Sequence, residues 1–570
     1  MSAVSVPPSV PKNPPPIVSS GAARWWIVSS WVDVVFIVLT PLLATPAILI
    51  LYSSWVGVRA ETISLIVAAF FATGHHLPGL LRAYGDRELF ERFRWRFLLA
   101  PPIVFLAYFP LYTYHFSLYR LIILTWATWH GLMQLYGFVR IYDAKVGSVS
   151  KSTVYWDWML CLCGFVTPQL LRPEQLSNLL GHLYAAGGPW ISTSILTTLR
   201  SSALVVSVVV LIGFALNFMV QWRIGSRPSI LKLIMLASGI GMWWYAMLGV
   251  DNLLIGVALF DICHDVQYLA IVWLINCRRA GANADLGWFM KSVFRRGMVL
   301  LYLGLITAYG AMAFAGQLVL DGTVQRIFYG VLFTSTILHY YYDGFIWKVR
   351  ETTTQAGLGL DQNGSRRSRE IRSREFTHLL KCSPVLLVLG LLFGTDLLDP
   401  GLTTSQKDRL ERLYANNLMG EPALPAGEAE RSWLYAHFER IQSIASAIPD
   451  DPSSQLNAAI MLANFGRNEE ATGRLEKLLV QHPNFCNAQL ALGGIYQRQG
   501  NSQRAAEYFH EALSSAATVE QRAMVNFNLG GVYLQQNDPA AADARFKAAL
   551  QDDPVMETAI RTFRQRVQSH

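Results

Sequence analysis

Long apolar runs alternate with short polar loops over the first 400 residues of the chain, and this pattern then stops. A run of about 20 apolar residues is long enough to cross the hydrocarbon core of a bilayer as an α-helix. We therefore predict ten or eleven membrane-crossing helices, the last of which is short and carries Asp396. The predicted helices are 26–52, 62–82, 97–115, 119–139, 154–172, 200–222, 228–248, 251–277, 297–319, 324–348 and 382–398.

The residues beyond 400 are polar and alanine-rich and contain no apolar run of that length. The predicted fold class is therefore all-α: a polytopic transmembrane helical bundle followed by a soluble helical domain. The Pro- and Ser-rich start of the chain is typical of disorder. We divide the chain into a disordered segment 1–23, a transmembrane domain 24–399, a helical linker or cap 400–450 and a repeat domain 451–570.

Basic residues are unevenly distributed between the loops. The loops after even-numbered predicted helices are rich in Lys and Arg, whereas those after odd-numbered helices hold only Arg59, Arg120, Arg172, Arg200 and Arg326. Because basic loops stay in the cytoplasm, we expect an integral membrane protein with a cytoplasmic N-terminus. We favour eleven crossings, which place the C-terminal domain on the periplasmic face of a bacterial inner membrane; with ten crossings it is cytoplasmic.

The net charge of +8 is a consequence of these loops rather than of a nucleic-acid-binding surface. The C-terminal part is mildly acidic and shows no basic face, so we expect no nucleic-acid partner. The six cysteines have no zinc-ligand spacing.

A repeat of about 34 residues runs through the C-terminal part. Three sets of residues recur at this spacing: Gly466, Gly500 and Asn537; Ala471, Ala505 and Ala542; Phe509 and Phe546. Small residues at a helix crossing and an aromatic residue in the second helix resemble the tetratricopeptide repeat, over about 452–554 as three units. This resemblance implies a solenoid of helix pairs that binds a protein partner.

Five histidines lie inside four of the predicted crossing helices: His75, His76, His130, His264 and His339. One such histidine can simply bond a neighbouring helix, but ionisable groups in hydrocarbon are costly and mark functional sites. Counted from the helix starts, at a rise of ~1.5 Å per residue, all five lie within roughly 6 Å of a common depth. Adjacent His75 and His76 point about 100° apart on an α-helix, which favours only one of them facing the others.

Carboxylates accompany these histidines at helical spacing. Asp261, His264, Asp265 and Tyr268 largely share one helix face, and Asp343 follows His339 by four residues. Nitrogen and oxygen donors without thiolates suit iron, manganese or zinc better than copper(I). The predicted metal ligands are His75, His76, His130, His264, His339, Asp261 and Asp343, and the predicted catalytic residues are Asp265 and Tyr268.

The histidine-rich polytopic part is generally similar to membrane non-haem iron enzymes that act on lipids. This group includes fatty-acid desaturases and hydroxylases and the bacterial Brp/Blh-type carotene dioxygenases. The similarity does not extend to motifs, because no HxxxH or HxxHH box occurs here. It implies mono- or dinuclear iron, dioxygen chemistry and a membrane lipid or isoprenoid-type substrate.

The leading hypothesis is thus a membrane-embedded, iron-dependent oxidoreductase whose repeat domain binds a protein. One alternative is a haem or quinone redox protein, because histidines on facing helices can be axial haem ligands. Another is a transporter or assembly scaffold in which the histidines relay protons. A lipid-linked glycosyltransferase is disfavoured, since Glu61 is the only acid of the first outer loop.

Overall fold

The computed structural model describes residues 25–53, 55–113, 117–148, 150–281, 285–318, 322–347, 402, 404–415, 424–425 and 427–568. Within these ranges the chain is helical and forms no β-strand, which confirms the all-α prediction. The predicted disordered segment 1–23 and the apolar run 382–398 lie outside the described residues.

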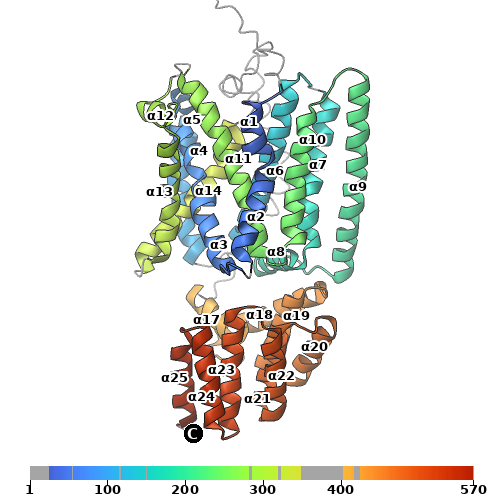
Figure 1. The fold of residues 1–570 in the computed structure, drawn as a ribbon, viewed down its shortest axis with the longest axis vertical. Helices are drawn as coiled ribbons and strands as arrows, with labels where there is room; N and C mark the ends of the chain where they lie inside the picture. The colour runs from blue at the N-terminus through green and yellow to red at the C-terminus, as the bar shows by residue number, and fades with distance from the viewer. Residues whose placement is uncertain are drawn as a thin grey trace, which may run out of the picture. The chain divides into compact units, whose positions relative to one another are not determined.

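Helices occupy the ten apolar stretches predicted before residue 350 (Figure 1). The first are α1 (Ser30–Asp33), the π-helix η2 (Val34–Val38), α2 (Thr40–Tyr52), α3 (Ala60–Ile66), the π-helix η3 (Val67–Thr73), α4 (His76–Gly85) and α5 (Arg87–Thr113). They are followed by α6 (Ser117–Lys145), α7 (Lys151–Leu171), α8 (Pro173–Ala185), α9 (Thr193–Arg223), α10 (Ile230–Trp244) and the π-helix η4 (Tyr245–Gly249). The last are α11 (Leu253–Gly281), α12 (Trp288–Val293), α13 (Val299–Leu318) and α14 (Gly322–Ile346).

Five described helical stretches are long and apolar enough to cross a membrane: Ala60–Gly85, Thr193–Arg223, Ile230–Gly249, Leu253–Gly281 and Val299–Gly316. A sixth results if Ser30–Val38 and Thr40–Tyr52, bent by 44° at their junction, form one crossing. The other helices at predicted positions carry more polar residues; α5, for example, begins with several arginines.

The chain divides into two compact units, which are described separately. The first comprises the described residues within Met1–Pro102, Thr128–Val166 and Val206–Arg366, and the second those within Ile103–Ala127, Thr167–Val205 and Arg367–His570.

In the first unit, glycines let helix backbones approach each other closely. A Cβ atom on Gly310 of α13 would lie 2.4 Å from the carbonyl oxygen of Ala69 in η3. A Cβ atom on Gly256 of α11 would lie 2.1 Å from the carbonyl oxygen of Ala246 in η4. Small residues at such crossings are typical of helices packed in a membrane, where close backbone contact contributes to association.

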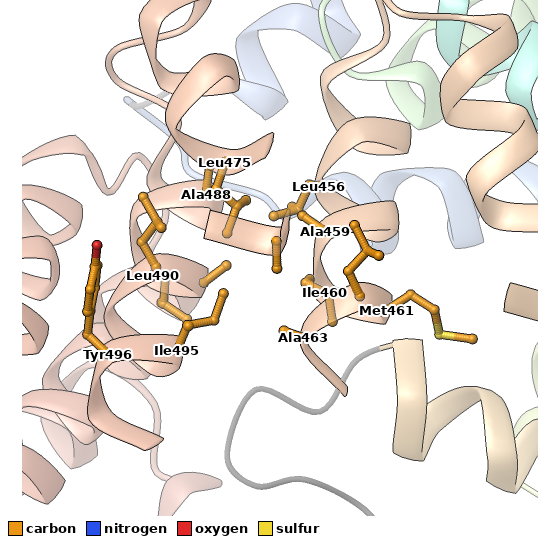
Figure 2. Close-up of a cluster of buried hydrophobic side chains, with 14 of the residues drawn as sticks. Leu456, Ala459, Ile460, Met461, Ala463, Leu475, Ala488, Leu490, Ile495 and Tyr496 are labelled. Atoms are coloured by element: carbon orange, nitrogen blue, oxygen red, sulfur yellow. The ribbon is translucent and has the colours of Figure 1, made fainter. Parts of the chain in front are cut away.

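In the second unit, helix pairs stack on one another. These helices are α17 (Thr404–Ala415), α18 (Glu428–Ala447), α19 (Pro452–Asn464), α20 (Asn468–Gln481), α21 (Cys486–Arg498), α22 (Ser502–Ser515), α23 (Val519–Gln535), α24 (Pro539–Asp552) and α25 (Met556–Gln568). Figure 2 shows the core between α19, α20 and α21, where Leu456, Leu475 and Leu490 are buried together with alanines. Alternating small and large residues allow adjacent helices to interdigitate at native density.

The repeated residues explain how each helix pair turns. Gly466, Gly500 and Asn537 end successive first helices with φ of 76°, 77° and 58°, a left-handed conformation that glycine and asparagine adopt at least cost. Gly493 lies against the ring of Phe509, where a Cβ atom would be 2.4 Å from Cε1. The recurrence of these residues is therefore the recurrence of one turn and one close crossing.

Candidate metal centre

The centre begins where a π-helical turn meets α4. The π-helix η3 ends at Thr73, and His75 is the residue that precedes α4. Single π-helical turns frequently occur at functional sites, because they change the direction in which the following side chains point. The rings of His75 and His76 both contact His339, with centroid separations of 4.4 and 4.6 Å. The contact of both rings with His339 differs from the expectation that only one of the two residues faces the other histidines, because that expectation assumed a regular α-helix.

The five histidines come together from four separate elements. His130 lies on α6, His264 on α11 and His339 on α14, and the centroid of each ring is within 6.4 Å of that of His75. His75, His76, His264 and His339 are buried, while His130 is half-buried. The convergence predicted from equal depth is therefore present.

Three ring nitrogens of this cluster meet at one point. Nε2 of His339 is 2.9 Å from Nε2 of His75 and 3.0 Å from Nε2 of His130. Nδ1 of His75 faces only acceptors, namely Oδ1 of Asp265 at 2.8 Å and the carbonyl oxygen of Phe71 at 3.2 Å. A neutral His75 therefore carries its proton on Nδ1 and directs the lone pair of Nε2 toward the other two rings.

This arrangement leaves buried polar atoms without hydrogen-bond partners. Nδ1 of His339 and Oδ2 of Asp265 have none within the described part of the chain. Buried polar groups are otherwise almost always paired, so each exception calls for an explanation. These two atoms are therefore available to a further bound group, separately from the Nε2 atoms.

Two overlapping groups of side chains have the spacing needed to hold a metal ion. The first is His75, His130 and His339, and the second is His75, His264 and Asp265; within each group the ligand atoms lie within 4.8 Å of one another. His75 belongs to both. His76, Asp261 and Asp343, which were predicted as ligands, belong to neither group.

Asp343 takes part instead in a hydrogen-bonded network beside the cluster. Its Oδ1 accepts from the hydroxyl of Tyr268 at 3.0 Å and from Nε1 of Trp347 at 3.0 Å, and its Oδ2 is 3.7 Å from Nε2 of His339. The guanidinium of buried Arg82 stacks 3.9 Å from the centre of the Trp347 ring. Such a network fixes the orientation of the side chain next to His339.

A glycine of α4 makes room for this network. A Cβ atom on Gly79 would lie 3.0 Å from the hydroxyl of Tyr268 and 3.5 Å from Oδ1 of Asp343. The same atom would be 3.7 Å from Nδ1 of His339. A side chain at residue 79 would therefore crowd the hydroxyl of Tyr268.

The remaining predicted residues lie at the edge of the site. Nδ1 of His76 is 2.9 Å from the hydroxyl oxygen of Ser335, which accepts from Tyr309 at 2.7 Å. The carbonyl oxygen of His264 accepts from Gln134 at 2.8 Å. Asp261 is half-buried, one helical turn before Asp265.

Several residues of the site were not found from the sequence. Arg82 was counted only among the basic residues that orient the predicted helices, whereas its side chain is fully buried. Ser335, Tyr309 and Trp347 have no distinguishing pattern among the many polar and aromatic residues of the apolar runs. The one available signal was position, because Trp347 follows His339 by eight residues and so lies on the same helix face.

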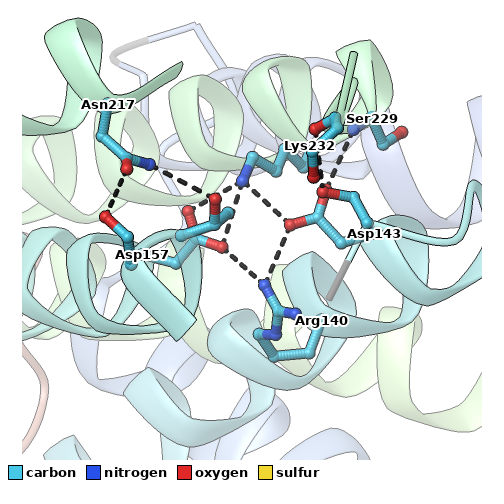
Figure 3. Close-up of polar contacts among 10 residues, drawn as sticks. Arg140, Asp143, Asp157, Asn217, Ser229 and Lys232 are labelled. Carbon is cyan, nitrogen blue, oxygen red and sulfur yellow. Dashed lines mark hydrogen bonds and ion pairs between the residues drawn. The ribbon is translucent and has the colours of Figure 1, made fainter. Parts of the chain in front are cut away.

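A second polar cluster is buried in the first unit and is shown in Figure 3. Nζ of Lys232 donates to Asp143 and to Asp157 at 2.9 Å, and Arg140 donates to the same two carboxylates at 2.9 and 2.8 Å. The backbone N–H of Ser229 also donates to Asp143 at 2.9 Å. Two cations thus neutralise two anions, so Lys232 is part of an internal ion network.

Comparison with known proteins identifies a repeat in residues 484–553. No curated protein sequence matches this chain. Residues 484–553 match the family model "Tetratricopeptide repeat", which confirms the tetratricopeptide repeat predicted for the C-terminal part of the chain.

Proposed function

We propose that the helices of the first unit cross a membrane and that their histidine cluster binds a metal ion, most favourably iron, in an oxidoreductase acting on a lipid-soluble substrate. The observation that carries this proposal is the meeting of the Nε2 atoms of His75, His130 and His339 at 2.9 and 3.0 Å. The tetratricopeptide repeats support a second role, the binding of a protein partner.

The exposed surface of α9 supports the membrane location. Only 11% of its most apolar 18-residue stretch is buried, and side chains such as Val209, Ile212 and Leu216 are exposed. A water-soluble protein rarely leaves a contiguous apolar surface of this kind uncovered. In a bilayer the same surface faces acyl chains at no cost.

The ligand atoms support a metal. Imidazole nitrogens bound at ~2.1 Å and at right angles on one ion lie about 3.0 Å apart, close to the two observed separations. The carboxylate of Asp265 on Nδ1 of His75 is the outer partner that commonly orients a metal-bound imidazole.

The donor set favours iron among the metals. Both candidate groups contain only imidazole and carboxylate, and neither contains a thiolate. Imidazole is a ligand that suits iron, and the candidate ligand atoms here are the Nε2 atoms of His75, His130 and His339, with Asp265 as the outer partner of His75. Iron supplies dioxygen activation when bound in such a set. The chain's own side chains would orient the ligands and keep water from a buried site.

An apolar cavity supports a lipid-soluble substrate. It measures about 340 Å³ and is lined by Leu80, Leu81, Tyr84, Gly85, Gly287, Trp288, Phe289 and Met290. This size and lining are typical of a site for an apolar ligand. The hydroxyl of Tyr84 is 3.0 Å from that of Tyr342, the neighbour of Asp343 in sequence.

The same nitrogen geometry disfavours haem. Two axial imidazoles lie on opposite faces of a porphyrin, so their bound nitrogens are about 4 Å apart with the ring between them. Nitrogens at 2.9 and 3.0 Å are too close for that arrangement and suit neighbouring positions on one ion.

Metal analysis with an optical spectrum of the detergent-purified protein tests the proposal. We expect one or two irons per chain and no Soret band. His264→Ala and His339→Ala should both lose metal, whereas His510→Ala, which removes an imidazole from the repeats, should retain it.

Two results would contradict this function. A Soret band would identify a haem protein. Absence of metal and pigment from a folded preparation would assign the histidines to proton relay, for which the chain from His76 through Ser335 to Tyr309 would be the first candidate.

A further inference from the structure

Helix α8 and the first repeat belong to the same compact unit and share an apolar interface. Leu176, Leu180 and Tyr184 lie on one face of α8, at the i, i+4, i+8 spacing of a helix. They are buried in one cluster with Ala447 and Ile448, which end α18 just before the first repeat. The apolar face of α8 is therefore covered by the repeat domain of the same chain.

Polar contacts fix the relative orientation of these two elements. The hydroxyl oxygens of Ser177 and Ser454 are 2.7 Å apart. Thr193 donates to the backbone carbonyl of Ser446 at 2.6 Å. These contacts join α8 and the start of α9 to the last turn of α18 and the first turn of α19.

An ion pair closes the edge of the interface. Nη1 of Arg200 is 3.0 Å from Oδ2 of Asp450, while its Nη2 donates to the carbonyl oxygen of Leu171 at 2.9 Å. Arg172 is likewise paired, with Glu174 at 2.9 Å. Arg172, which precedes α8, and Arg200 of α9 are thus both paired within the second unit.

The charge of the loops then indicates on which side of the membrane this interface lies. The segment between α7 and α9 contains no lysine. In contrast, Arg140, Lys145 and Lys151 precede or begin α7, Arg223 ends α9 and Arg227 follows it. Because basic loops stay in the cytoplasm, α8 belongs to the opposite side.

We propose that the repeat domain is docked on α8, on the non-cytoplasmic side, and therefore recruits an extracytoplasmic protein. This inference rests on the membrane location proposed above and not on the metal. The placement of the repeat domain on the non-cytoplasmic side does not depend on the apolar run 382–398. It agrees with the eleven crossings predicted from the sequence.

Reporter fusions to the full chain test the side. Alkaline phosphatase, which is active only outside the cytoplasm, should be active when fused after His570. The same enzyme inserted after Gly225 should be inactive. A fluorescent cytoplasmic reporter after His570 with inactive phosphatase would overturn the placement. Activity after Gly225 would instead overturn the membrane orientation, whatever the metal content.

A disulfide tests the docking. The double variant Ser177→Cys with Ser454→Cys should form the disulfide in intact cells without added oxidant, because the non-cytoplasmic compartment is oxidising. After digestion without a reducing agent, mass spectrometry should show the disulfide-linked peptide in most of the protein molecules. The linked peptide should be absent from each single variant. It should also be absent when Ser177→Cys is combined with Ser514→Cys, because Ser514 is an exposed residue of α22. Absence of the disulfide from a folded double variant, even with a copper oxidant, would overturn the docking.

Discussion

The first unit contains two buried polar clusters of opposite character. Around Lys232, two cations and two carboxylates are matched in number and joined by hydrogen bonds of 2.8 to 2.9 Å. Around His75, five imidazoles gather, three of them with Nε2 facing Nε2 at 2.9 and 3.0 Å, and Nδ1 of His339 has no hydrogen-bond partner among the described residues.

The difference between the two clusters distinguishes a structural ion network from a binding site. A buried ion network that is internally complete needs no further group, and it fixes the positions of the helices that contribute to it. Three Nε2 atoms that face one another are only partly satisfied by hydrogen bonds, because a single proton on Nε2 of His339 can serve one of its two neighbours well, whereas one cation could bind all three. We therefore interpret the Lys232 cluster as structural and the histidine cluster as a binding site.

The largest expected effect is on metal content. His75→Ala should abolish metal binding, because His75 belongs to both candidate ligand groups. The loss should exceed the roughly 10–100-fold typical of removing an outer partner. His76→Ala removes the adjacent imidazole, which belongs to neither group, and should retain metal. Equal loss in both variants, measured by elemental analysis of folded protein, would refute the assignment of ligands.

The next effect is on stability and separates the clusters directly. Lys232→Met leaves two carboxylates with one cation in a buried site and should destabilise the protein by about 3–5 kcal/mol. Metal per folded chain should stay unchanged. The exposed Lys151 gives the matched control, since Lys151→Met should change stability by less than about 0.5 kcal/mol. Thermal unfolding in detergent measures both; a small effect of Lys232→Met would mean that its network is not structural.

A smaller effect tests the outer carboxylate. Asp265→Asn should weaken metal binding by roughly 10–100-fold, because the amide no longer stabilises the Nδ1 proton of His75. Asp261→Asn, the same change one helical turn earlier, should have little effect. If titration of the apoprotein with ferrous iron shows the larger loss for Asp261→Asn, the sequence-based ligand set is the better one.

The periodic features of this protein were predictable from its sequence. Apolar runs fixed the approximate positions of the helices, and the recurrence of Gly466, Gly500 and Asn537 identified the repeats, because each position requires the same left-handed turn. The common depth of the five histidines followed from their distance to the helix starts. These are properties of single helices or of one turn, and so they depend on residues close in sequence.

The site was predictable only in part, for a related reason. Asp265 was given a catalytic role, whereas the structure places it on Nδ1 of His75. Asp343 was predicted as a metal ligand, and one of its carboxylate oxygens accepts hydrogen bonds from Tyr268 and Trp347. Which partner a carboxylate meets depends on the rotation of each helix about its axis, and a π-helical turn such as η3 changes that rotation without a clear sequence signal.

The sequence alone therefore determined where the long apolar helices form, that the C-terminal part repeats, and which histidines lie at a common depth. The tertiary structure decided that His75 is shared between two ligand groups, that Lys232 is neutralised internally, and that α8 lies against the first repeat. The physical reason is the separation of the interacting residues along the sequence. Helices and turns depend on residues that are close in sequence. Candidate ligand groups and ion networks depend on contacts between distant residues, such as His75 and His339, which only the packing of helices brings together.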